Sequence, residues 1–234
     1  MASRAESGLP PAPRLRAAVR TAATDFYFNS WRLVPANLLW GAAVLLILVA
    51  ATIVPSAIFL APLLALPTAW IFRMAGRIGR DEPTSFWDGL AAWRSPLPVL
   101  LLGVAFAGCA AIFCGNIVIG IASDSLVGWA IATFAFWGLV AEWLLAWTVW
   151  PLLFDSARAD RPVRQRLRLA VLLVLAHPRQ IGGLGLVLLA LLALSTIAFV
   201  ALLTISVAFS ALVAARYVLP AADRLETALG GARP

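Results

Sequence analysis

The sequence predicts an all-α fold, a polytopic membrane bundle of six transmembrane helices arranged as three hairpins, with amphipathic interfacial helices on the cytoplasmic side. Hydrophobic residues make up 62% of the 234-residue chain and charged residues only 12%, about half the charged fraction of a soluble domain. The basic residues are all arginine, and long apolar stretches separate them into the bands Arg4 to Arg32, Arg73 to Arg94, Arg158 to Arg179 and Arg216 to Arg233. Because Arg-rich loops stay on the cytoplasmic side, the bands indicate how often the chain crosses the membrane.

The N-terminal part is expected to contain a tail, an interfacial helix and the first crossing. Residues 1–13 are polar and contain prolines, so we predict a disordered tail before a single transmembrane domain at 14–222. Leu15, Ala18, Val19, Ala22 and Phe26 recur at helical spacing and indicate an amphipathic helix at the membrane surface. The apolar run 33–54 then has the length needed to span the hydrocarbon.

The second crossing, predicted at 57–73, carries Pro62 and Pro67 in its interior. Each proline removes a backbone hydrogen bond, so this helix should kink or break. A basic loop follows, in which Ser85 and Asp88 have the spacing of a capping box. This pair predicts the start of a second interfacial helix.

The third and fourth crossings are predicted at 97–121 and 126–150, joined by a short outer turn. Small residues spaced four apart in the third crossing favour the close approach of another helix; they are Gly103, Ala107, Ala111 and Gly115. Residues 154–168 form the most basic loop. Val163, Leu167, Val171 and Val174 recur at helical spacing and predict a third amphipathic helix that ends at His177 and Pro178.

The apolar run from Ile181 to Leu219 must fold back on itself. As one helix it would be about 57 Å long, whereas the hydrocarbon is about 30 Å thick. We therefore predict crossings at 182–199 and 201–219, a turn between Ser195 and Thr204, and a cytoplasmic tail at 223–234. Six crossings keep both termini in the cytoplasm, and the expected location is the bacterial cytoplasmic membrane.

Glu142 is an ionisable residue deep inside a predicted crossing, where such groups are costly and often functional. It could be a proton or cation site in a polar cavity, or half of a structural ion pair. The ion pair is the simpler interpretation, with Arg73 as the first candidate partner and Arg216 as the next. Asn37 and Asn116 could bind helices together or line the same cavity. Glu142, Arg73, Asn37 and Asn116 form the candidate intramembrane polar site.

Motifs for catalysis and for metal binding are not found in the sequence. There is no Walker A loop, no H-E-x-x-H and no nucleophile elbow, and the chain has a single histidine and two cysteines. We therefore expect no enzymatic activity, no cofactor and no metal. The net charge of +7 comes from arginines that flank apolar segments, where they suit anionic lipid headgroups. The expected partners are the lipid bilayer and a permease or other membrane protein, not nucleic acid.

Residues 25–40, DFYFNSWRLVPANLLW, resemble the start of the YesL-like family of bacterial membrane proteins. The resemblance continues through Pro62 to Pro67, Arg73, Arg77, Glu82 and the segment from Ser85 to Asp88, and it covers roughly the first 95 residues. It implies no established activity and no assigned functional residues. It does imply an association with genes for carbohydrate use and sugar uptake.

Three functions follow from these observations. The first is an accessory or regulatory component of solute uptake, with carbohydrate as the expected solute. The second is a small transporter or channel in which Pro62, Pro67, Asn37, Asn116 and Glu142 line a path. The third is a membrane scaffold that binds lipid or partner helices.

Overall fold

The computed structural model describes residues 14–94, 96–198 and 201–230, and the regular elements within these ranges are all helical. They are α1 (Leu15–Ile53), η1 (Pro55–Leu64), α2 (Ala65–Gly79), η2 (Phe86–Arg94), α3 (Pro96–Ala122), α4 (Leu126–Leu153), η3 (Ser156–Arg158), α5 (Val163–Ala176), α6 (Pro178–Ile197), η4 (Leu202–Ser206) and α8 (Val207–Ala228). Six helical segments in the described chain are long and apolar enough to cross a membrane. The all-α class and the six candidate spans are therefore confirmed.

The predicted interfacial helix and the first crossing form one continuous helix, α1, with Pro35 inside it. The face that was expected to meet lipid headgroups packs on protein instead. Ala18 and Ala22 are buried, and the ring of Phe26 meets Phe209 of α8 edge to face, with centroids 5.9 Å apart. An apolar stripe on a helix can face either lipid or a neighbouring helix. The sequence alone therefore could not distinguish a helix at the membrane surface from one packed on protein.

The prolines of the second crossing break it, as predicted. Pro55 opens the 3-10 helix η1, Pro62 lies inside it, and the α-helix begins at Ala65. Pro67 then falls in the first turn of α2, where its missing N–H would have no helical partner. The crossing therefore consists of a 3-10 half and an α-helical half.

The capping box before η2 is also confirmed. The backbone N–H of Ser85 donates to the Asp88 carboxylate at 2.6 Å, and the N–H of Asp88 donates to Ser85 Oγ at 3.2 Å. These reciprocal bonds satisfy donors that the start of a helix would otherwise leave free.

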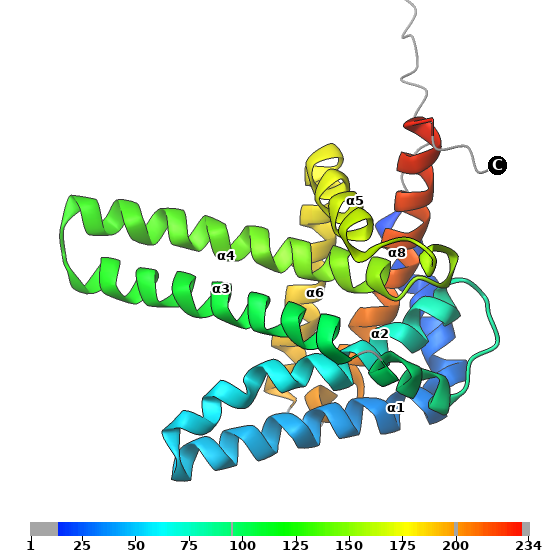
Figure 1. Ribbon diagram of the computed structural model, residues 1–234, viewed down its shortest axis with the longest axis horizontal. Helices are drawn as coiled ribbons and strands as arrows, with labels where there is room; N and C mark the ends of the chain where they lie inside the picture. Colours follow the sequence, from blue (N-terminus) through cyan, green and yellow to red (C-terminus); the bar gives the residue numbers. More distant parts are fainter. Residues whose placement is uncertain (1–13, 95, 199–200, 231–234) are drawn as a thin grey trace, which may run out of the picture.

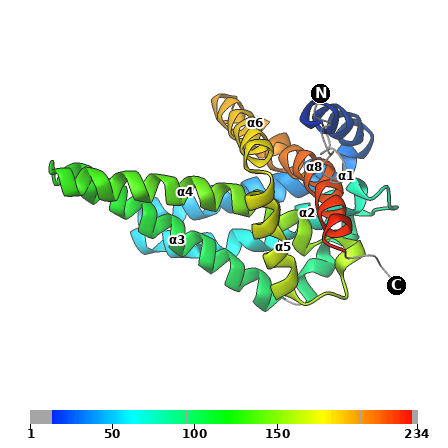
Figure 2. The ribbon, with the colours of Figure 1, turned by 90° about the horizontal axis from the view of Figure 1, so that it is seen from above.

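Helices α3 and α4 form a long hairpin that projects from the rest of the molecule (Figures 1 and 2). In their most apolar stretches only 6% and 11% of the residues are buried. The small-residue face of α3 is used at Gly103, where an added Cβ would lie 2.6 Å from that of Ala65, but not at Gly115, which has open space. The two helices also pack closely near the tip, where an added Cβ on Gly120 would lie 2.4 Å from the carbonyl oxygen of Gly128.

Helix α8 occupies the centre, with 78% of its most apolar stretch buried, and it packs against α1, α2, α4, α5 and α6. In the crossing that contains α2, 28% of the most apolar stretch is buried. The crossings are thus buried to very different extents, and the three-hairpin arrangement is not confirmed. Helix α8 also extends to Ala228, so residues 223–228 of the expected tail are helical.

The connection between the last two crossings lies after Ile197, the end of α6, and before Leu202, the start of η4. Residues 199 and 200 lie outside the described residues, as does the tail predicted at 1–13.

The third amphipathic helix is α5, and its buried face agrees only in part with the predicted one. Leu167 and Val174 pack against the core and are partly buried. Leu169, Ala170 and Leu173 are buried, whereas Val163 and Val171 are exposed. The reason is that α5 packs against α4, α6 and α8, and these neighbours select the buried face. An interfacial position for α5 is not confirmed.

Candidate functional site

Glu142 lies on α4 in the wall of a groove of about 420 Å³ that is formed by α1, η1, α2, α3 and α4. The lining is mainly apolar and includes the aromatic side chains of Trp40, Phe106, Trp143 and Trp150. The Oε2 atom of Glu142 is buried and has no hydrogen-bond partner in the described part of the chain. A polar oxygen left in this state costs free energy unless a proton or a ligand compensates it.

Neither predicted arginine pairs with Glu142. Arg73 Nε donates to the backbone carbonyl of Asp88 at 2.9 Å. Arg216 pairs with Asp25 at 2.5 Å and with Asp81 at 2.7 Å. Neither ion pair expected for Glu142 forms, because a backbone carbonyl of η2 holds Arg73 and the carboxylates of Asp25 and Asp81 hold Arg216.

The two asparagines do not line the groove beside Glu142. Asn37 is fully buried; its Nδ2 donates to the carbonyl of Leu203, and its Oδ1 accepts from the N–H of Ala208, both at 2.8 Å. It binds two helices together, which was one of its two predicted roles. Asn116 is half-buried on α3. The four predicted residues therefore do not form one site, and Glu142 is the member that faces the groove.

The structure adds residues that the sequence analysis missed. Trp40 Nε1 donates to Thr68 Oγ1, and Trp143 Nε1 donates to the carbonyl of Gly185, both at 3.1 Å, so the two indoles are held in place beside the groove. A neighbouring pocket of about 240 Å³ shares Trp40, Trp143 and Trp150 with the groove. Tryptophans in an apolar run look alike in sequence, so only the arrangement of the helices identifies those that face the groove.

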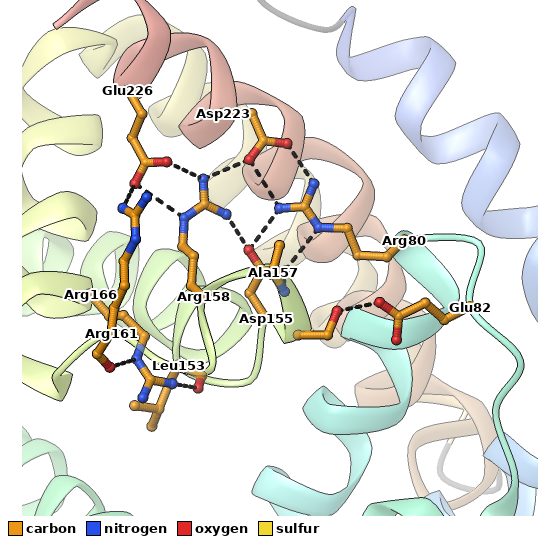
Figure 3. A network of polar contacts seen from close by, with 11 residues as sticks. Arg80, Glu82, Leu153, Asp155, Ala157, Arg158, Arg161, Arg166, Asp223 and Glu226 are labelled. Carbon is orange, nitrogen blue, oxygen red and sulfur yellow. Dashed lines mark hydrogen bonds and ion pairs between the residues drawn. The ribbon is translucent and has the colours of Figure 1, made fainter. Parts of the chain in front are cut away.

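A network of ion pairs joins three arginines to three carboxylates and is drawn in Figure 3; its members are Arg80, Arg158, Arg161, Asp155, Asp223 and Glu226. We call the end of the molecule that holds this network its basic end. Arg80 follows the end of α2 and donates two hydrogen bonds to the Asp155 carboxylate, from Nε at 2.9 Å and from Nη2 at 2.7 Å. It also forms an ion pair with Asp223 at 2.5 Å. Arg158 pairs with Asp155, with Asp223 at 2.7 Å and with Glu226 at 3.0 Å. The side chains of Asp155 and Arg158 are completely buried.

The charge state of this network follows from its geometry. Burial alone would lower the pKa of Arg80, but its bonds to Asp155 and Asp223 outweigh burial and raise the pKa. Burial likewise opposes the charge of Arg158, whereas Glu226, Asp155 and Asp223 raise its pKa. Both guanidinium groups therefore remain charged, as their bidentate contacts require.

The network joins the end of α2, the segment between α4 and α5, and the end of α8. The arginine bands that contain Arg80 and Arg158 therefore meet at one end of the molecule. Arg216 extends this end to Asp25 of α1. The bands were visible in the sequence. Apart from the pair of Arg158 with Asp155, three residues away, the ion pairs of Arg80 and Arg158 join residues that lie 65 to 143 positions apart in the chain.

Comparisons with known proteins identify no relative: no family model matches the chain, and neither a curated protein nor a solved structure does. The resemblance to the YesL-like family stays a prediction.

Proposed function

We propose that this protein is a membrane protein of solute uptake that binds a small solute in the groove beside Glu142, and that it acts as a transporter in its own right. We also propose that its basic end faces the cytoplasm of a bacterial plasma membrane. The observation that carries the proposal is the unpaired, buried Oε2 of Glu142 in an aromatic groove between candidate membrane spans.

The surroundings of Glu142 suit a solute with hydrogen-bond donors or a positive charge. A carboxylate accepts hydrogen bonds from hydroxyl groups and pairs with cations. Tryptophan faces attract cations, and rigid aromatic side chains offer large flat surfaces for apolar contact. The broken crossing formed by η1 and α2 contributes Pro62 and Thr68 to the same groove, and broken helices line substrate sites in other transporters.

Uptake should be measured in proteoliposomes that contain the purified protein and no other. Radiolabelled mono- and disaccharides and small organic cations would be presented with and without a pH gradient. We expect saturable uptake of at least one of these solutes, lost in Glu142→Gln. No uptake by the unchanged protein across both classes would contradict the proposal.

Asp124→Asn is the matched control because it removes the same charge from an exposed turn. Asp124 has a positive φ of 43°, which asparagine tolerates. Uptake should persist in this variant. Loss of uptake in both variants would show a general effect of charge and would remove Glu142 from the mechanism.

A second function, an accessory protein that docks on a permease, is favoured by the α3–α4 hairpin. The hairpin projects from the molecule and exposes large apolar side chains such as Val118 and Phe134. Site-specific photo-crosslinkers at these two positions should capture a permease in native membranes. Crosslinks to lipid alone would leave the hairpin as a lipid-facing element and contradict the accessory role.

A further inference from the structure

A second cavity, of about 410 Å³, lies at the basic end of the molecule and is separate from the Glu142 groove. Its walls come from α2, η2, the first turn of α3, the end of α4 and the start of α5. Arg73, Arg77 and Arg166 line it together with the carboxylate residues Glu82 and Asp155. The remainder of the wall is mainly apolar.

The carboxylates of this cavity are already engaged. The Nε atom of Arg77 lies 3.4 Å from Oε2 of Glu82, and its Nη1 atom lies 3.0 Å from Oδ2 of Asp88. Asp155 belongs to the network of Arg80 and Arg158. The carboxylates at and beside the cavity are therefore paired with Arg77, Arg80 and Arg158.

Arg73 and Arg166 have no such partner among the described residues. Arg73 donates to the carbonyl of Asp88, and Arg166 donates to the carbonyls of Arg161 and Leu153. Burial lowers the pKa of Arg166, and the more distant Asp155 offsets this only in part. The cavity thus holds two half-buried guanidinium groups, on α2 and α5, which donate to backbone carbonyls and form no ion pair among the described residues.

The surface beside the cavity is apolar. Pro98 and Val99 of α3 line the cavity, while Leu97 and Leu101 on the same turns are 65% and 60% exposed. Trp87 of η2 is also exposed, and tryptophan is enriched at the level of lipid headgroups. A group bound between Arg73 and Arg166 would therefore lie next to a surface suited to acyl chains.

We infer that the cavity between Arg73 and Arg166 binds a phosphate group, supplied by an anionic phospholipid headgroup or by free phosphate. The planar fork of arginine matches phosphate oxygens and forms charge-assisted hydrogen bonds with them. The site is distinct from the Glu142 groove, and it can be present whether or not the protein transports a solute.

Native mass spectrometry of the full chain in detergent would count bound phosphatidylglycerol, with zwitterionic phosphatidylcholine as reference. A parallel arm would measure the change in melting temperature on adding inorganic phosphate, with sodium chloride at equal ionic strength as reference. Arg73→Gln with Arg166→Gln should weaken binding in the responsive arm by roughly tenfold or more, since charged hydrogen bonds are lost. Phosphatidylglycerol binding identifies a lipid site, whereas a response to inorganic phosphate alone identifies a soluble anion.

Arg164→Gln is the matched control, because Arg164 lies on the same helix α5, is exposed and carries the same charge. It should bind like the unchanged protein. Ala159→Leu is a second test that removes no ion pair: Ala159 is exposed and lines the cavity, so added bulk should also weaken binding. The inference is overturned if the unchanged protein responds in neither arm, if Arg164→Gln weakens binding as much as the double variant, or if Ala159→Leu binds normally.

Discussion

The side-chain amide of Asn37 bridges the carbonyl of Leu203 and the N–H of Ala208. These backbone groups lie five residues apart, the spacing of a π-helix hydrogen bond. Leu203 lies within the π-helical element η4, and Ala208 lies in the first turn of α8. One side chain of α1 therefore satisfies both backbone groups where α8 begins. The contact also brings the two helices together, because Asn37 is fully buried.

Replacing Asn37 by alanine should destabilise the protein. The substitution removes the partner of the buried N–H of Ala208 and of the partly buried carbonyl of Leu203, which costs about 1–3 kcal/mol. Equilibrium unfolding of the purified protein in mixed micelles with increasing SDS would measure this loss. Asn116→Ala is the control, since Asn116 is half-buried on α3 and should change the free energy of unfolding little. Equal losses in both variants would contradict a special role for Asn37.

Patterns among neighbouring residues predicted the helices, whereas contacts between residues far apart in the chain determine how those helices pack and which side chains pair. The apolar runs gave six candidate spans because the bilayer fixes the length of a crossing, and the capping box of Ser85 needs only a neighbour three residues away. The partners of Arg216 could not be predicted in this way, because Asp25 lies 191 residues distant. Contacts between residues far apart in the chain also leave the Oε2 atom of Glu142 without a partner in the described part of the chain, and they select the buried face of α5.

Removing the carboxylate of Asp155 should be strongly destabilising. In Asp155→Asn the buried guanidinium of Arg158 loses one of its partners and Arg80 loses its bidentate contact. Breaking a buried ion pair from one side costs about 3–5 kcal/mol, since the remaining charge stays desolvated. SDS unfolding would detect this. Asp160→Asn, in the same segment but exposed, should leave the stability unchanged, and a comparable loss there would point to a general charge effect.

The glycines of α3 should differ sharply in their tolerance of a methyl group. In Gly120→Ala the new Cβ would lie 2.4 Å from the Gly128 carbonyl oxygen, a backbone atom that cannot move alone. We expect a loss of about 1–3 kcal/mol, typical of overpacking. In Gly115→Ala the new Cβ meets nothing within 4 Å, so stability should be retained. Melting temperatures in detergent compare the two, and equal values would show that the hairpin tip is not closely packed.

The ion pairs also make a prediction about membrane topology. Arg216 joins α8 to Asp25 of α1 and to Asp81 beyond α2, so these three parts of the chain must lie on the same side of the membrane. Arginine-rich segments favour the cytoplasm. A phosphatase that is active only outside the cytoplasm should therefore be inactive when fused after Gly230 and active when inserted at Asp124, in the turn between α3 and α4. The 2.5 Å contact keeps Arg216 and Asp25 on one side of the membrane, so activity after Gly230 would place both of them outside and would contradict a cytoplasmic basic end.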